Sequence, residues 1–215
     1  MTEDLFKAQY DITQKSRLKI FYEKNKKIIF STASIVFILI VSFIFYLDNL
    51  KKKKISLSDD YVQARIYVEN GKSKEALILL RSIVFSNDSY YSTLSFFYIL
   101  EKNLITDRKK IMSLFNHILK KNKFDKEIEN LIIFKKAIFE SSYLDESDLL
   151  KTVGPLINNE NLWKPHALML MGDYFLSKKE NLKAKEFYLQ ILDIKNLNKE
   201  LYSQAKSQLS SIVND

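Results

Sequence analysis

The chain has no cysteine among its 215 residues, which excludes disulfides, thiolate metal sites and thiol catalysis. Residues that break helices are also scarce, because the chain holds only three glycines and two prolines. The alternating β-branched runs, bounded by turn residues, that strands require are missing as well. Together these absences predict an all-α chain.

Sequence motifs for catalysis are missing too. There is no P-loop, no G-x-G-x-x-G and no H-E-x-x-H. The two histidines, His117 and His166, share no motif with a carboxylate pair or with each other, so a packing or surface role is the better interpretation. We therefore expect no enzyme, no cofactor and no catalytic or metal-binding residue.

One long apolar run, from Ile28 to Leu47, stands out instead. Its 20 residues include no charge, no proline and no glycine. As a helix they would cover roughly 30 Å, the thickness of the hydrocarbon core of a bilayer. A buried core helix is rarely apolar on every face for this length. A cleaved signal peptide is also disfavoured, because 27 residues precede the run and no A-x-A-like site follows it. The run predicts an uncleaved transmembrane helix, with the lipid bilayer as a partner.

The lysines and arginines near its ends predict the orientation of this helix. Four lysines follow the run, at positions 51–54. Six basic residues lie just before it, and they are Lys15, Arg17, Lys19, Lys24, Lys26 and Lys27. The balance favours a cytoplasmic N-terminus, although the four lysines after the run argue the other way.

The distribution of charge also changes just after the predicted membrane helix. Residues 1–54 hold 11 Lys and Arg against 5 Asp and Glu, whereas residues 55–215 hold 23 against 21. Basic residues thus gather beside the predicted membrane helix and do not form the patch of a nucleic-acid binder. We expect four segments, namely a basic cytoplasmic arm (1–27), a transmembrane helix (28–47), a juxtamembrane linker (48–55) and a helical repeat domain (56–215).

Local signals mark individual helices in this domain. Ser56 and Ser58 are residue types that begin helices, and Gly71 is a natural stop. We expect an interruption at Gly154-Pro155, because proline breaks helices. The segment from Tyr90 to about Asn103 is strongly apolar, and we expect most of its large residues to be buried, namely Tyr91, Leu94, Phe97, Tyr98 and Leu100.

A repeated pattern runs through the domain. Its clearest unit reads Leu168-x-x-Met171-Gly172-x-x-Phe175 and then Ala184-x-x-x-Tyr188, which matches the tetratricopeptide pattern with apolar substitutes. The small residues Gly172 and Ala184 are 12 positions apart, so they would lie on facing helices of one hairpin. Phe175 and Tyr188 would fill the space beside them.

The same step of 12 residues recurs along the chain. It joins Ala64 to Ala76, with Tyr67 in the aromatic position. Weaker units occur at Leu100/Met112 and Ala137/Leu149, and the four units start 36, 37 and 35 residues apart. This spacing predicts an α-solenoid of about four helical hairpins, in which the C-terminal helix 200–213 is a cap. The alternative is a non-repetitive helical bundle whose alanines simply pack.

The layout as a whole resembles a known bacterial membrane family. A basic arm, one span near residue 28 and a tetratricopeptide-like domain that includes LWKPHALMLMGDYFLSKKENLKAKEFYLQIL are similar to the tetratricopeptide repeat-like family that includes the ancillary subunit of the SecYEG translocon. The resemblance is most specific from Trp163 to Leu192. It implies an inner-membrane protein with a periplasmic C-terminal domain, which works beside a membrane-anchored periplasmic chaperone. The family has no catalytic residues to carry over.

Two classes of function follow from these features. The first is a membrane-anchored protein–protein interaction module of the Sec translocon or the periplasmic chaperone network, which assists secreted and envelope proteins. The second is a structural or regulatory scaffold in envelope assembly or cell division, which uses the same repeats for another partner. Neither class involves nucleic acid or a small-molecule substrate.

Overall fold

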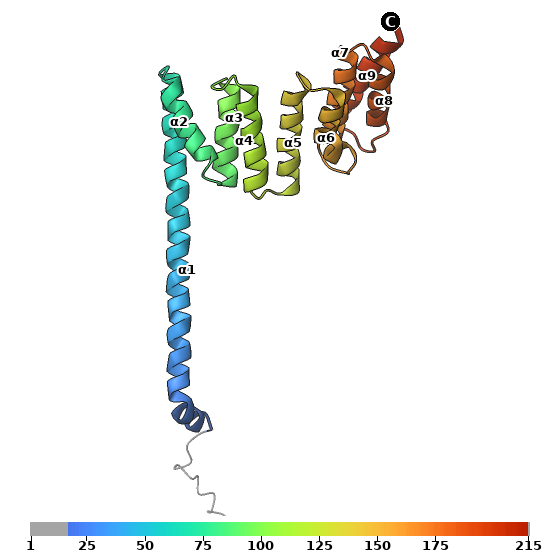
Figure 1. Ribbon diagram of the computed structural model, residues 1–215. Helices are drawn as coiled ribbons and strands as arrows, with labels where there is room; N and C mark the ends of the chain where they lie inside the picture. Colours follow the sequence, from blue (N-terminus) through green and yellow to red (C-terminus); the bar gives the residue numbers. More distant parts are fainter. Residues whose placement is uncertain (1–16, 215) are drawn as a thin grey trace, which may run out of the picture. The chain divides into compact units, whose positions relative to one another are not determined.

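The computed structural model describes residues 17–214. These residues form helices joined by short links and contain no strand, which confirms the predicted all-α class. Figure 1 shows the order of the helices. Their bounds are α1 Arg17–Glu69, α2 Ser73–Val84, α3 Ser89–Glu101, α4 Arg108–Lys121, α5 Lys126–Ser141, α6 Glu146–Ile157, α7 Lys164–Ser177, α8 Asn181–Leu192 and α9 Lys199–Asn214.

Helix α1 is continuous over 53 residues, so the expected helix start at Ser56 was wrong. The segment 48–55, which we expected to be a linker, is helical throughout. It contains no proline or glycine, and an ion pair of 2.8 Å joins Asp48 to Lys52 one turn apart. Serine inside a helix costs only about 0.5 kcal/mol relative to alanine, so Ser56 does not stop it.

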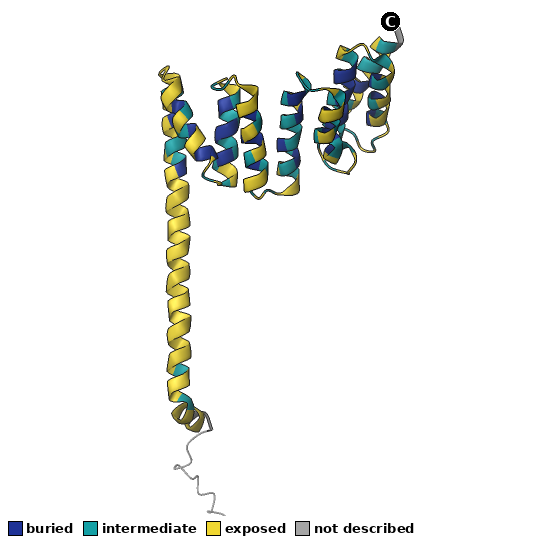
Figure 2. Cartoon of the chain, viewed as in Figure 1, coloured by how far each residue is buried: buried dark blue, intermediate teal, exposed yellow. Residues whose placement is uncertain are grey.

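The chain divides into two compact units at Leu57 and Ser58, within α1. In the first unit the apolar run 28–47 is exposed along almost its whole length, as Figure 2 shows. Its hydroxyl groups bond within the helix, since Thr32 donates to the Ile28 carbonyl at 3.0 Å and Ser34 to the Phe30 carbonyl at 2.9 Å. Among the described residues, α1 is the one helix long and apolar enough to cross a membrane.

Local sequence signals mark several helix ends in the second unit. Gly71 has φ +73°, and the amide of Lys72 beside it bonds to the Tyr67 carbonyl at 2.8 Å, which ends α1 as predicted. Asp88 begins α3 by accepting the amides of Tyr90 and Tyr91. Such caps satisfy amides that would otherwise lack partners at the first turn.

Helix α6 runs through Pro155, so the expected interruption at Gly154-Pro155 was wrong. The proline lies in the last turn, where only the bond to the Lys151 carbonyl is lost, and Lys151 is exposed to water. The amide of Asn158 still donates to the Gly154 carbonyl at 3.1 Å. A proline near the C-terminal end therefore leaves the helix intact.

Two apolar clusters form the core of the second unit, whose buried residues are dark blue in Figure 2. Buried residues of α1 to α5 build the first cluster, around Phe96 and Phe115. Residues of α5 to α9 build the second, around Phe175 and Tyr188. Helix α5 belongs to both, because it contributes Ile132 to the first and Ala137 to the second. Each helix from α2 onward packs on the next one.

Candidate functional site

The best-matched repeat unit forms the tightest helix pair, α7 and α8. The closest neighbours of Gly172 are ring atoms of Tyr188, so that a Cβ at position 172 would come within 2.5 Å of the ring. The hydroxyl of Tyr188 donates to Asp173 at 2.7 Å. Burial, and then the bond to Asp173, raise the pKa of Tyr188. Gly172 thus makes room for an aromatic ring that bonds to the next residue.

The other residues of the repeat pattern also lie inside the protein. Tyr67 is half-buried. The fully buried members are Ala64, Ala76, Leu168, Met171, Phe175, Ala184 and Tyr188. Side chains without contact to solvent hold helices together and offer nothing to a partner. A binding surface has to be sought among other residues.

The basic residues that predict the topology lie at the start of the chain. Lys15 is outside the described residues, and Arg17 is the first residue of α1. Lys19, Lys24, Lys26 and Lys27 lie on α1 before the apolar run, and their side chains are exposed.

Both histidines and the tryptophan take part in packing. The Trp163 ring stacks on Phe134 with centroids 5.7 Å apart, and its Nε1 donates to the Glu127 carbonyl at 3.0 Å. His166 meets the same Phe134 ring edge-on at 5.8 Å. His117 Nε2 lies 3.0 Å from Asn87 Oδ1. Within residues 17–214, no group of three or more His, Cys, Asp or Glu residues could hold a metal ion.

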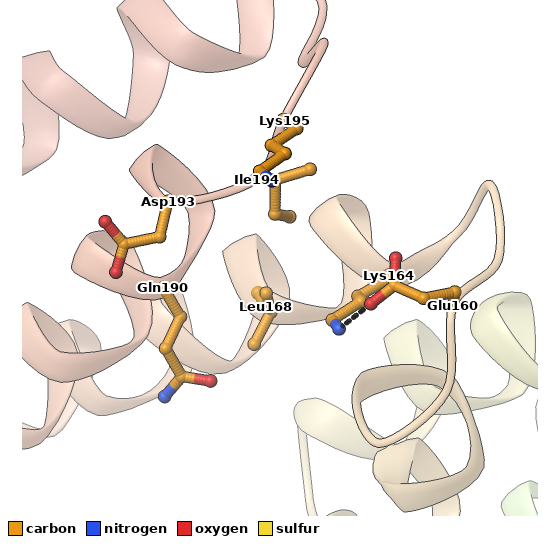
Figure 3. A pocket seen from close by; sticks show the side chains of 7 residues that line it. All are labelled: Glu160, Lys164, Leu168, Gln190, Asp193, Ile194 and Lys195. Carbon is orange, nitrogen blue, oxygen red and sulfur yellow. Dashed lines mark hydrogen bonds and ion pairs between the residues drawn. The ribbon is translucent and has the colours of Figure 1, made fainter.

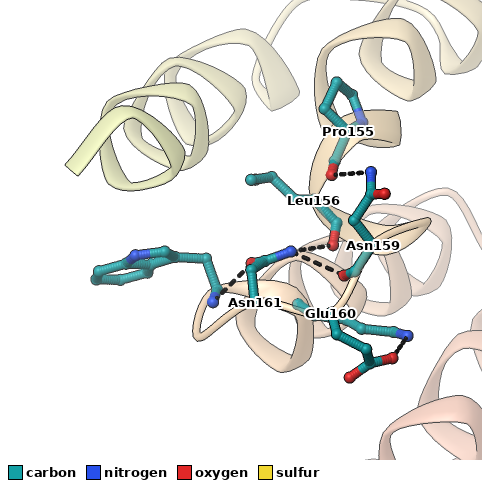
Figure 4. A network of polar contacts seen from close by, with 7 residues as sticks. Pro155, Leu156, Asn159, Glu160 and Asn161 are labelled. Atoms are coloured by element: carbon teal, nitrogen blue, oxygen red, sulfur yellow. Dashed lines mark hydrogen bonds and ion pairs between the residues drawn. The ribbon is translucent and has the colours of Figure 1, made fainter. Parts of the chain in front are cut away.

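The loop between α6 and α7 is ordered by asparagine side chains, as Figure 4 shows. Asn161 Nδ2 donates to the carbonyls of Leu156 and Asn159 at 2.8 and 2.9 Å, and Asn161 Oδ1 accepts the amide of Trp163 at 2.9 Å. These bonds place Trp163 against α5. The loop is therefore a structural connection between α6 and α7, and its bonds fix the position of Trp163.

A hollow of about 400 Å³ lies beside this loop, between α7, the end of α8 and the residues that follow it (Figure 3). Charges of both signs line it, and Lys164 is already paired with Glu160. Asp193 and Lys195 lie on its other side. Because its charges are mixed, the hollow does not favour a ligand of either sign.

A larger groove of about 580 Å³ lies between α3 and α5 and is mostly apolar. We refer to it as the α3/α5 groove. Its polar residues are Ser89, Thr93, Lys123 and Asp125. Its apolar lining comes from α3, from α5 and from the link before α5, and consists of Tyr90, Leu94, Phe97, Phe124, Ile128 and Leu131.

The inner side chains of the groove pack against the core, whereas side chains at its rim are exposed to solvent. Phe97 and Phe124 pack against the first core cluster, and the Phe97 ring lies 6.5 Å from that of the buried Phe115. Tyr90 and Ile128 are 66% and 46% exposed. Large apolar groups that face solvent around a concave surface are typical of sites that bind another apolar group.

Sequence reasoning missed this groove because it assigned the wrong face of α3 to the core. Leu94 and Phe97 are half-buried, as are Tyr91, Tyr98 and Leu100, whereas Ser92, Ser95, Phe96 and Ile99 are buried. The apolar residues of α3 surround the helix, so their spacing selects no face. Two serines face the core because their small side chains let α3 pack closely, and Ser92 Oγ donates to the Ile83 carbonyl at 3.1 Å.

No family model, no curated protein and no solved structure matches this chain. Two features of the molecule itself bear most directly on its function. One is the exposed apolar run of α1, and the other is the α3/α5 groove.

Proposed function

We propose that this chain is a membrane-anchored protein–protein interaction module. The apolar run of α1 anchors it in a bilayer, and the helical domain binds an apolar segment of another protein. The observation that carries the proposal is the α3/α5 groove, whose rim leaves the apolar side chains Tyr90 and Ile128 open to solvent. A groove of this size accommodates a few large side chains.

The groove favours an uncharged segment. Lys123 and Asp125 are its only charged residues and have opposite signs, so the groove carries no net charge. Apolar burial of about 25 cal/mol per Å² is then the main source of binding energy. An extended or helical peptide with two or three large apolar side chains is the partner that fits this chemistry.

The helical domain of this proposal is a tetratricopeptide-like α-solenoid with α9 as its cap. Three observations support it, namely the burial of Ala64, Ala76 and Ala184, the contact of Gly172 with Tyr188, and the regular spacing of the units. The packing of α5 on α7 and of α7 on α9 agrees with it, because alternate helices of a stacked array are neighbours.

For the cellular setting, we propose an inner-membrane protein with a cytoplasmic N-terminus and a periplasmic helical domain. The partners are the SecYEG translocon and a membrane-anchored periplasmic chaperone, with which the module assists secreted and envelope proteins. This part is supported by the family resemblance of residues 163–192 and by the six basic residues before the span.

Site-specific crosslinking in cells tests the function. A photoreactive amino acid is placed at Tyr90 or Ile128, and at Ile78 on α2 as a control, because Ile78 is 73% exposed and does not line the groove. We expect crosslinks to translocon or chaperone subunits from the groove positions and not from Ile78. Crosslinks to envelope-assembly or cell-division proteins would favour the scaffold function, and equal crosslinking at all three positions would contradict a role for the groove.

A further inference from the structure

Four consecutive lysines of α1, at positions 51–54, surround the helix. Consecutive residues of an α-helix are about 100° apart, so four of them point in all directions around the axis. All four side chains are exposed. They therefore form a ring of positive charge around α1, which we call the lysine collar.

Few acidic residues lie near the collar along α1. Asp48 pairs with Lys52 at 2.8 Å, and the next acidic residue along the chain is Asp59. The two apolar residues that flank the collar, Leu50 and Ile55, are 41% and 51% exposed. Exposed apolar side chains directly beside basic ones are typical of the boundary between hydrocarbon and water.

The continuity of α1 sets the depth of the collar. If the hydrocarbon layer ends at Leu47, the collar begins four residues later and ends seven residues later, which is about 6 to 10 Å along the axis. The headgroup layer on each side of a bilayer is about 5 to 8 Å thick. Flexible lysine stems can bend back over the remaining distance, so all four ammonium groups can reach the phosphates.

We propose that the lysine collar binds the phosphate groups of anionic phospholipids in the leaflet on the side of the helical domain. The inference depends on the proposed membrane span of α1 and adds a lipid partner to it. It also gives the four lysines a role despite the cost that they impose on the predicted orientation. Lipid is favoured over an acidic protein because a ring that faces every direction suits a ligand that surrounds the helix.

The test uses the full-length chain in nanodiscs of phosphatidylcholine mixed with phosphatidylglycerol. Electron spin resonance measures how strongly the protein immobilises spin-labelled phosphatidylglycerol relative to spin-labelled phosphatidylcholine. We expect a preference of about fivefold or more for the anionic lipid, since each lysine near such a surface contributes about 1 kcal/mol. The preference should fall as salt is added.

A variant in which Lys51, Lys52, Lys53 and Lys54 are all replaced by glutamine should lose the share of this preference that the collar contributes, and the four-arginine variant should retain it. The matched control removes four exposed lysines from α4, and these are Lys109, Lys110, Lys120 and Lys121. The control variant should keep the preference of the unaltered chain.

Other results would contradict either the lysine collar or the membrane anchor. A preference that the glutamine variant keeps, or that the α4 control also loses, would overturn the collar and leave the anchor in place. A chain that alkaline carbonate extracts from membranes would overturn the anchor itself, and the collar with it.

Discussion

The ring of Tyr188 lies directly against Gly172, and its hydroxyl donates to the neighbouring Asp173 at 2.7 Å. The ring therefore has contacts on its face and at its tip. Because Tyr188 is fully buried, the surrounding residues of α7 and α8 leave it little room to move. This relationship explains why the pattern has glycine at position 172 and why the last hairpin is closely packed.

Gly172→Ala should destabilise the protein by about 1–3 kcal/mol, because the added methyl group forces the Tyr188 ring out of its position. Thermal unfolding of the full-length chain in detergent, followed by circular dichroism, measures the effect. If the ring is the cause, Gly172→Ala should cost much less in a Tyr188→Leu background. An equal cost in both backgrounds would show that the glycine is needed for another reason.

Tyr188 should also make stability depend on alkaline pH. Burial raises the pKa of its hydroxyl above the ordinary value of 10.0, so the folded state holds this proton after the unfolded state has lost it. The contribution is fully present below pH 10.0 and is lost as the pH rises further, by up to about 1.4 kcal/mol per pH unit. Unfolding of the unaltered chain and of Tyr188→Phe between pH 8 and pH 11 measures this, with a shallower decline expected for the variant. Parallel declines would contradict the prediction.

Substitutions at the rim of the α3/α5 groove should affect binding far more than folding. Tyr90→Glu and Ile128→Glu place charge in an apolar groove, and because both sites are exposed, the cost to stability should stay within about 0.5 kcal/mol. With the photoreactive amino acid at the other of these two positions, we expect each substitution to reduce the crosslinking yield about tenfold or more, since an unpaired charge in an apolar contact costs more than 1.4 kcal/mol.

Ile78→Glu on α2 is the control for these substitutions, because it adds the same charge at an exposed site outside the groove. The crosslinking yield of this variant should match that of the unaltered chain. If the three variants bind equally well, the groove is not the binding surface.

The sequence predicted much of the local structure, because short-range chemistry determines it. Gly71 ends α1 through its positive φ, as predicted. The start of α4 has the same local character, since Asp107 accepts the amides of Lys109 and Lys110. Neither feature depends on distant contacts, so each can be recognised from the residue type and its place in the chain.

The predictions from sequence were wrong where the local preference of a residue is outweighed by the helix around it or by tertiary packing. Ser56 has the chemistry of a helix start, yet the strong helix on both sides of it continues. Pro155 breaks helices in general but lies too near the end of α6 to do so. The α3/α5 groove was missed because Leu94 and Phe97 resemble core residues, and only packing shows that the face with Ser92 and Ser95 is the buried one.

The orientation of the chain in the membrane decides which partners it can reach. Lys19, Lys24, Lys26 and Lys27 lie exposed on α1 before the apolar run and, with Lys15 and Arg17 earlier in the chain, favour an N-terminus that stays in the cytoplasm. A reporter that is active only outside the cytoplasm, fused after Asp215, should therefore be active. Protease added to spheroplasts should digest the helical domain.

Removing the flanking charges makes the orientation test sharper. Replacing the basic residues before the run with glutamine leaves only the lysines at 51–54, so part of the population should invert and reporter activity should fall. Glutamine at positions 51–54 should instead keep or raise the activity. An inactive reporter on the unaltered chain, together with a domain that resists external protease, would place the helical domain in the cytoplasm. The groove would then serve a cytoplasmic scaffold, because a periplasmic chaperone could not reach it.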